Sequence, residues 1–511
     1  MKTSAVAAVV TCAGVGLAGA GGNAARAQDW TTGGYDAQRS SWVRAEGKIS
    51  TAALRKPGFQ LLWRLTLAHE STAGRGVTAP VLLDLMIGYR GFRALGFVGA
   101  PPDHVVAIDT DLGLVEWERR FAPEARATGG SAACARDMTP NLARPTNAAL
   151  PTVIGGVGGA SRAGRPAHGA VGDPGEGAVT LAQVGARRRE TPPGAPAPPQ
   201  SPAPRPAPRP FAIVYVLPSD GMLRTLNAMN GADAESPVPF LPPHTNARGL
   251  IIVDDVAYVA TARGCGGAPD GIWALDLGAK QVTTWRAPGG IAGALGPAVA
   301  PDRTIYVTTG DGQVIALEPR TLKQRRAYRS GGPAFVSSSV IFDHRGRLLI
   351  AAASRDGRVR MLDSRGTAFI RTPLVAHAAA PAAVALASWA DTNDTRWLLM
   401  PGGALRGAIV AWKVAQHDTV PTLQSGWMSG DMPGPLAAAV VNDVIFAVSR
   451  GAPASSPAVL YALDGATGKE LWNSGTTIPT GGRTALSAGG SQVYVATGDG
   501  TLYAFGFPME H

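Results

Sequence analysis

The sequence predicts an all-β protein, an eight-bladed β-propeller of four-stranded antiparallel blades, closed by pairing of an N-terminal strand with the last blade. Glycine and proline make up about a fifth of the 511 residues, whereas charged residues are only 16%. Such a density of helix breakers favours short strands joined by tight turns. A strand-turn-strand pattern also recurs along the chain, with copies spaced by the length of one propeller blade.

The repeat is clearest in residues 460–472, where an alternating strand leads through an Asp-x-x-Thr-Gly turn to a second strand that carries tryptophan. Apart from one long interval, successive copies are about 40–50 residues apart. Each unit is a small sheet that cannot cover both of its faces, so neighbours must stack into a ring. The copies are anchored on one apolar residue each: Ile108, Leu226, Leu275, Leu317, Leu362, Trp412, Leu463 and Phe505.

The four strands of one blade can be followed in a single repeat. Residues 297–300, 304–309, 313–317 and 323–328 alternate with turn sequences. The Asp311-Gly312 turn between the second and third strands requires a positive φ, which glycine permits. Equivalent Asp-Gly pairs occur at Asp220-Gly221, Asp356-Gly357 and Asp499-Gly500.

Ring closure is predicted from the two ends of the repeat region. The last copy stops just past Phe505 and has no outer strand of its own, whereas residues 60–65 resemble the tryptophan-bearing outer strand of the other copies. We therefore expect residues 60–65 to complete the eighth blade.

The long interval between the first two copies contains an insertion at about 152–210. Residues 142–151 suit an inner strand and residues 211–217 the next one, while proline dominates 192–210. Such a stretch favours an extended, solvated loop, so we interpret the insertion as disordered. A docking role for the loop, and a ninth, degenerate blade within the interval, stay open as alternatives.

The N-terminus indicates export. Residues 1–27 have the features of a signal peptide, with Lys2, a small apolar stretch and a predicted cut after Ala27. Residues 28–511 then form a single periplasmic or secreted propeller domain, interrupted by the insertion and without a membrane-spanning segment. Export leaves Cys134 and Cys265, which we expect to form a disulfide in an oxidising compartment; two free thiols are the alternative.

Charge and histidine placement exclude other classes of function. The net charge is +10, but part of it lies in the insertion, and no basic stripe interleaved with aromatic residues is present. Nucleic-acid binding is therefore not expected. The eight histidines are scattered without metal-ligand spacing, so no metal site is predicted. We expect a monomer.

The repeat resembles that of the pyrroloquinoline-quinone (quinoprotein) β-propellers, over nearly all of residues 29–508 outside the insertion. Residues 29–36, with Arg39 and Ser40, also look like the N-terminal segment of that family. The resemblance implies that the repeat tryptophans dock on neighbouring blades and that the Asp and Gly residues hold tight turns. The residues to which these structural roles carry over are Asp109, Gly113, Trp117, Trp285, Asp464, Gly468 and Trp472.

The resemblance leaves the activity open, because the family includes dehydrogenases and proteins without catalysis. The alcohol dehydrogenase branch carries adjacent cysteines and a calcium-binding acidic set, and this chain has no Cys-Cys pair. Our first hypothesis is an exported scaffold, without catalytic activity, that binds a small-molecule ligand or an envelope protein partner. The alternative is an oxidoreductase dependent on pyrroloquinoline quinone, of the alcohol or sugar dehydrogenase type, with a divergent site.

Candidate ligand-binding residues are the arginines Arg90, Arg93 and Arg144, since guanidinium groups pair well with anionic ligands. Arg144 is expected to face the central channel. No catalytic residue is assigned, and pyrroloquinoline quinone with Ca²⁺ is a cofactor that only the family resemblance suggests.

Overall fold

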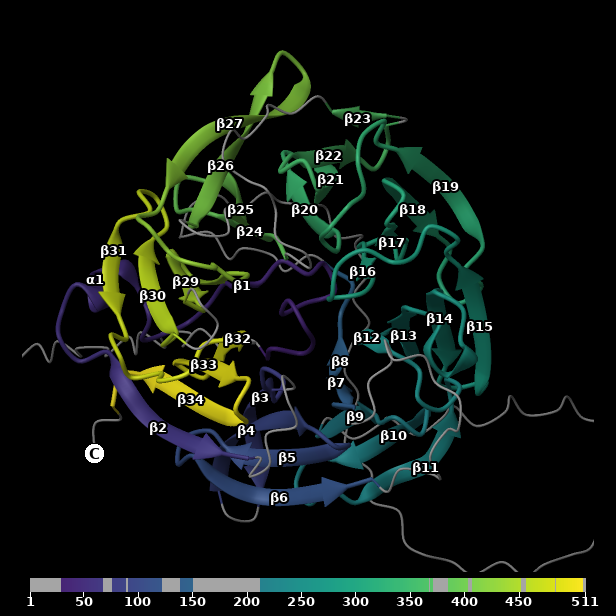
Figure 1. Cartoon of the computed structure of the whole chain (residues 1–511), viewed down its shortest axis with the longest axis horizontal. Coiled ribbons are helices and arrows are strands. Elements are labelled where there is room, and N and C mark those ends of the chain that lie inside the picture. Colours follow the sequence, from purple (N-terminus) through teal and green to yellow (C-terminus); the bar gives the residue numbers. More distant parts are fainter. Residues whose placement is uncertain are drawn as a thin grey trace, which may run out of the picture. The chain divides into compact units, whose positions relative to one another are not determined.

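The computed structural model describes residues 29–67, 76–88, 91–121, 138–149, 212–366, 368–370, 385–402, 407–451, 456–482 and 484–508. These residues form eight sheets arranged in a ring (Figure 1). The prediction of an eight-bladed propeller is therefore confirmed. The only α-helix among the described residues is the short α1 (Thr51–Leu54). The predicted signal peptide, the insertion, Arg90 and Cys134 lie outside the described residues.

Each of the first four blades is an antiparallel sheet ordered from the centre outwards. The first is β3 (Val81–Gly88), β4 (Gly91–Ala100), β5 (His104–Asp109) and β6 (Leu114–Arg120). The second is β7 (Asn141–Ala143), β9 (Ile213–Leu217), β10 (Met222–Asn227) and β11 (Asp233–Pro239). The third is β12 (Ala247–Val253), β13 (Val256–Thr261), β14 (Gly271–Asp276) and β15 (Gln281–Arg286), and the fourth is β16 (Ala298–Val299), β17 (Ile305–Thr308), β18 (Gln313–Leu317) and β19 (Gln324–Arg329).

The other four blades follow the same plan. The fifth is β20 (Val340–His344), β21 (Arg347–Ala353), β22 (Val359–Asp363) and β23 (Phe369–Ile370). The sixth is β24 (Ala387–Ala390), β25 (Arg396–Gly402), β26 (Ala408–His417) and β27 (Val420–Met428). The seventh is β28 (Ala439–Val441), β29 (Val444–Ser449), β30 (Val459–Asp464) and β31 (Glu470–Asn473), and the eighth is β32 (Thr484–Gly489), β33 (Gln492–Thr497), β34 (Thr501–Gly506) and β2 (Gln60–Thr66).

The eight anchor residues of the repeat all lie on the third strand of their blades, and all are buried. The third strand is buried because blades on both sides cover its alternating side chains. The Asp-Gly turns also form as expected, with positive φ at the glycine in each case, for example 81° at Gly312. The repeat frame read from the sequence is thus the blade frame of the fold.

The ring is closed by β2, as predicted. This strand pairs antiparallel with β34, from Gln60 opposite Gly506 to Thr66 opposite Thr501. The pairing places the N-terminal strand on the outer edge of the last blade and supplies the strand that the last repeat lacks. Closure of this kind removes the open end at which another chain would pair.

The inner part of the second blade differs from the expectation of one strand over 142–151. Only β7 belongs to the second blade, and β8 (Pro145–Thr146) instead pairs in parallel with β12 of the third blade. Pro145 lacks a backbone N–H and is therefore suited to the edge position that it takes there. A second short strand from the N-terminal region, β1 (Trp42–Val43), pairs in parallel with β28 of the seventh blade.

The hydrophobic core lies between the blades. One cluster joins the first and second blades, with Ala107 of β5 packed among residues that include Val214 of β9, and every other junction has a corresponding cluster. Stability therefore comes from contacts between successive repeats, as in other repeat proteins. No helix among the described residues is long and apolar enough to cross a membrane.

Candidate functional site at the centre of the ring

The centre of the ring is occupied by residues 29–43, here called the central segment, of which β1 is visible inside the ring in Figure 1. Its carbonyl groups accept hydrogen bonds of 2.7–3.0 Å from the inner parts of six blades, and Thr32 donates to Leu250 of a seventh. The six backbone donors are the amides of Leu82, Arg144, Val299, Ile341, Ser388 and Val440.

The central segment follows a curled path because several of its residues adopt positive φ. Gly34, Tyr35, Arg39 and Ser41 have φ values of 78°, 80°, 60° and 53°. This conformation costs free energy in residues other than glycine and persists only where the surroundings fix it. Here the curled path turns successive carbonyls towards different blades, so the surrounding ring fixes the conformation.

Arg39 is the most completely buried charged side chain of the central segment, at 1% exposure. Its Nε donates to the Pro297 carbonyl at 2.9 Å, its Nη1 to Gly33 at 2.6 Å and to Thr32 Oγ1, and its Nη2 to Gly249 at 2.8 Å. Burial lowers the pKa of Arg39 to about 9, although Asp36 opposes that shift. The guanidinium therefore stays charged at neutral pH and ties the segment to the third and fourth blades.

A cluster of acidic side chains lies where the first and eighth blades meet the central segment. Its members are Asp29, Glu46, Asp84 and Asp111. Asp29 accepts a hydrogen bond of 2.9 Å from the Asp84 amide, and Glu46 accepts one of 2.7 Å from the Ser491 hydroxyl. Burial, followed by the charges of Glu46, Asp29 and Asp111, raises the pKa of Asp84 to about 6.

This acidic group predicts a pH-dependent stability. Since the pKa of Asp84 is raised in the folded state, this residue contributes favourably to the free energy of unfolding at pH 4. That contribution is lost as the pH rises through about 6. Asp84→Asn should be more stable than the wild type by about 1–2 kcal/mol at pH 8, allowing for partial solvent screening, and equally stable at pH 4. Urea unfolding at both pH values measures this. Asp418→Asn, at an exposed site, is the control, and an unchanged difference between pH 4 and 8 contradicts the assignment.

The two predicted arginines that the structure describes are engaged with protein carboxylates. Arg93 on β4 pairs with Glu116 and lies 3.9 Å from Asp109, all within the first blade. Arg144 is buried, pairs with Asp29 of the central segment and donates to the Leu82 carbonyl at 2.9 Å. Arg93 thus stabilises the first blade, and Arg144 helps to hold the central segment in place.

The predicted docking residues lie at blade junctions. Trp117 Nε1 donates to the Ala228 carbonyl of the second blade at 2.8 Å, and its ring covers Gly231. Trp285 packs in the cluster between the third and fourth blades, and Trp472 contacts Phe505 of the eighth blade at a ring-centroid separation of 5.6 Å.

The turn residues of the repeat act on the chain immediately after the third strand. The Asp109 carboxylate accepts hydrogen bonds from the amides of Asp111 and Leu112, and Asp464 does the same for Ala466 and Thr467. Gly113 and Gly468 close these turns with φ of 67° and 70°.

Two further tryptophans have the same role and were not singled out as docking residues from the sequence. Trp63 Nε1 donates to the Thr110 carbonyl at 2.9 Å, and Trp427 Nε1 donates to the Gly465 carbonyl at 2.8 Å. A Cβ on Gly113 would lie 2.6 Å from Trp63 Cγ, so glycine is required there. The sequence feature that could have identified both residues is a tryptophan on the outer strand of a blade. In the structure, each of these tryptophans packs against the turn of the next blade.

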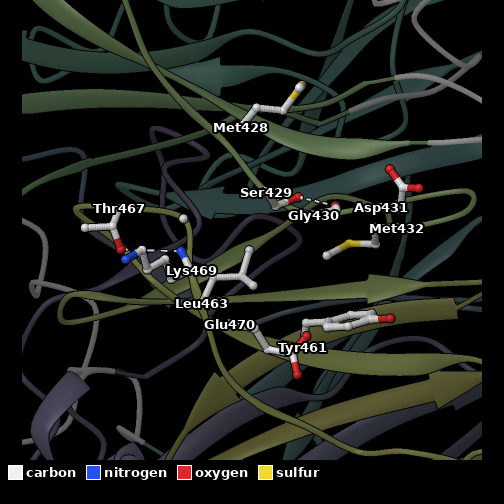
Figure 2. A pocket seen from close by; sticks show the side chains of 11 residues that line it. Met428, Ser429, Gly430, Asp431, Met432, Tyr461, Leu463, Thr467, Lys469 and Glu470 are labelled. Atoms are coloured by element: carbon white, nitrogen blue, oxygen red, sulfur yellow. Dashed lines mark hydrogen bonds between the residues drawn. The ribbon is translucent and has the colours of Figure 1, made fainter.

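A shallow groove lies on the surface between the sixth and seventh blades, with a volume of about 290 Å³. Figure 2 shows Met428 and Met432 on one side and Tyr461, Lys469 and Glu470 on the other. Met428 is 58% exposed. Burial and the Glu470 charge raise the pKa of Tyr461, so this phenol is neutral at physiological pH. The blade 6–7 groove therefore combines apolar contacts with charges of both signs.

The described residues contain no cluster of metal-ligating side chains. Within them, no three or more His, Cys, Asp or Glu side chains converge to hold a metal ion, whereas Ca²⁺ takes six to eight oxygen ligands. Arg93 and Arg144 are paired with carboxylates, and the centre is filled by the central segment. Cys265 is buried, but Cys134 lies outside the described residues, so the disulfide stays a prediction.

The described residues form an eight-bladed propeller, and comparisons with known proteins relate its repeat to that of the quinoprotein propellers. The family model described as "Outer membrane protein assembly factor BamB" matches residues 407–507, from the sixth blade to the eighth. The resemblance to the quinoprotein-like repeat family is thereby confirmed. No curated protein matches the chain in sequence.

Solved structures of similar fold include dehydrogenases. Quinohemoprotein alcohol dehydrogenase from Comamonas testosteroni has a TM-score of 0.55 at 14% identity, covering 96% of this chain and 82% of that chain. A europium-containing methanol dehydrogenase has a TM-score of 0.54 at 13% identity, covering 94% and 98%. At these identities the likeness shows the fold alone.

Proposed function

We propose that this protein is an exported propeller scaffold, without catalytic activity, that binds a partner protein of the cell envelope. The observation that carries the proposal is the central segment. Small ligands commonly bind along the inner strands of propellers, and here those strands are hydrogen-bonded to the chain's own residues 29–43. This arrangement favours recognition by the outer surface of the ring.

The blade 6–7 groove is the surface we assign to the partner. It falls within residues 407–507, the region that matches the family of an outer membrane assembly factor. Exposed Met428 supplies a flexible apolar side chain, which suits an adaptable binding surface. Asp431, Lys469 and Glu470 line the same groove and would orient a partner by charge.

A position-specific crosslink tests this surface. A photo-crosslinking amino acid at position 428 in the expressing cell should give a discrete adduct with an envelope protein. Val420 is the matched control, because it is exposed on the same strand but does not line the groove. Equal labelling from both positions, or none from position 428, contradicts the assignment.

The oxidoreductase alternative and the site of action need separate measurements. Mature protein mixed with pyrroloquinoline quinone and Ca²⁺ should show no bound-quinone spectrum and no dye reduction with alcohols or sugars. Stoichiometric quinone binding with turnover would overturn the scaffold proposal.

For export, we propose that the protein recovered from the periplasm or medium begins at Gln28, which N-terminal sequencing tests.

A further inference from the structure

Arg396, at the start of β25, is a partly buried arginine that has no acidic ion-pair partner among the described residues. It lies over two aromatic rings, 5.6 Å from the centroid of Trp42 and 6.0 Å from that of Phe342. Among the described residues, none forms a hydrogen bond or ion pair with its guanidinium, although Asp343 and Asp394 are near enough to influence it electrostatically. No Arg396 nitrogen is among the buried side-chain atoms that lack a hydrogen-bond partner, so its N–H groups are open to solvent or to a ligand.

An unsatisfied buried nitrogen lies on the neighbouring blade. His344 ends β20 and is 8% exposed, and within the described structure its buried Nε2 has no hydrogen-bond partner. Burial and the charges of Arg345 and Arg396 lower its pKa. Phe342, two residues earlier on β20, lies under the Arg396 guanidinium. A neutral imidazole with hydrogen on Nε2 is a hydrogen-bond donor. His344 precedes the turn between the first two strands of the fifth blade, and Arg396 follows the equivalent turn of the sixth blade. Both residues therefore lie on the same face of the ring.

Trp42 of the central segment and Arg44, just after it, supply the rest of this site. Arg44 lies 4.3 Å from the centroid of the Trp42 ring and is held by Asp36 at 3.4 Å. Two guanidinium groups therefore lie over the Trp42 ring. That of Arg44 is paired with the Asp36 carboxylate, whereas that of Arg396 has no carboxylate partner among the described residues. An anion bound at Arg396 would supply the counter-charge that Asp36 supplies to Arg44.

We propose that Arg396 and His344 bind a small oxyanion, a carboxylate or a phosphate group, on the face of the ring where the central segment ends at Trp42. The planar guanidinium fork matches two oxygens of such a group, and the imidazole donates to an oxygen of the same anion. Binding would join the fifth blade, the sixth blade and the central segment. The inference goes beyond the proposed scaffold function, and either can fail without the other.

Thermal unfolding in low millimolar sodium phosphate or sodium acetate tests the site, with sodium chloride at equal ionic strength as the reference. At about ten times the dissociation constant, the effective anion should raise the wild-type midpoint by about 1–2 °C above chloride. Arg396→Gln should abolish this difference. Arg303→Gln makes the same change in charge at an exposed ion pair and should retain it.

The opposite outcomes are equally clear. No excess over chloride with either anion overturns the proposal, as does the same excess in Arg396→Gln. If Arg396→Gln fails to fold, His344→Phe removes the second donor and is read by the same titration, with at least a threefold weaker response expected. Acetate and phosphate titrations compared with each other identify which oxyanion the site prefers.

Discussion

Replacing Arg39 by alanine should destabilise the protein by about 3–5 kcal/mol. The change removes a fully buried guanidinium and leaves the carbonyls of Gly33, Gly249 and Pro297 without their donors. It also opens a cavity at the centre of the ring, where relaxation is limited by the surrounding blades. Urea unfolding monitored by tryptophan fluorescence measures the loss.

The matched control is Arg303→Ala, which removes an exposed arginine paired with Asp254. Exposed ion pairs contribute little, so this variant should lie within about 1 kcal/mol of the wild type. An Arg39→Ala variant as stable as Arg303→Ala would mean that the central segment does not depend on its buried cation.

Replacing Trp63 by alanine should cost about 2–4 kcal/mol, because this side chain docks the closing strand on the first blade. The change loses the hydrogen bond to the Thr110 carbonyl and the contact over Gly113. Since β2 also joins the two ends of the ring, the variant should be cut faster by protease than the wild type. Urea unfolding and timed proteolysis provide the two readouts.

Trp63→Phe separates the two contributions to this docking. Phenylalanine keeps an aromatic ring over Gly113 but cannot donate to Thr110, so we expect a loss of about 0.5–1.5 kcal/mol. If the alanine and phenylalanine variants are equally stable, then ring packing at this junction contributes little and the docking account is wrong.

The blade frame was predictable because it is local and periodic. Leu317 and Leu463 stand at equivalent points of repeats whose strands and turns are read within a few residues. The closing strand at 60–65 was also predictable, since the last repeat lacks the strand that this segment resembles. The inner strand of the second blade was not, because β8 crosses to the third blade at a proline.

The central segment was not predictable as the filling of the ring. Its contacts run from its own carbonyls to amides such as those of Val299 and Val440, and backbone groups leave no mark on residue type. Arg39 appeared in the sequence only as part of a family-like N-terminal segment. The Asp29 partner of Arg144 and the aromatic rings under Arg396 were likewise hidden, because these contacts depend on which blades and segments become neighbours after the chain closes.

Hydrogen–deuterium exchange of residues 30–43 tests the central claim most directly. Amides of Thr31, Tyr35 and Arg39 are hydrogen-bonded within a buried segment, so peptides covering 30–43 should exchange as slowly as peptides covering β29. The same experiment on Arg39→Ala should show faster exchange in this region. Exchange of residues 30–43 within seconds in the wild type, as for an exposed terminus, would contradict a ring whose centre is filled by its own chain.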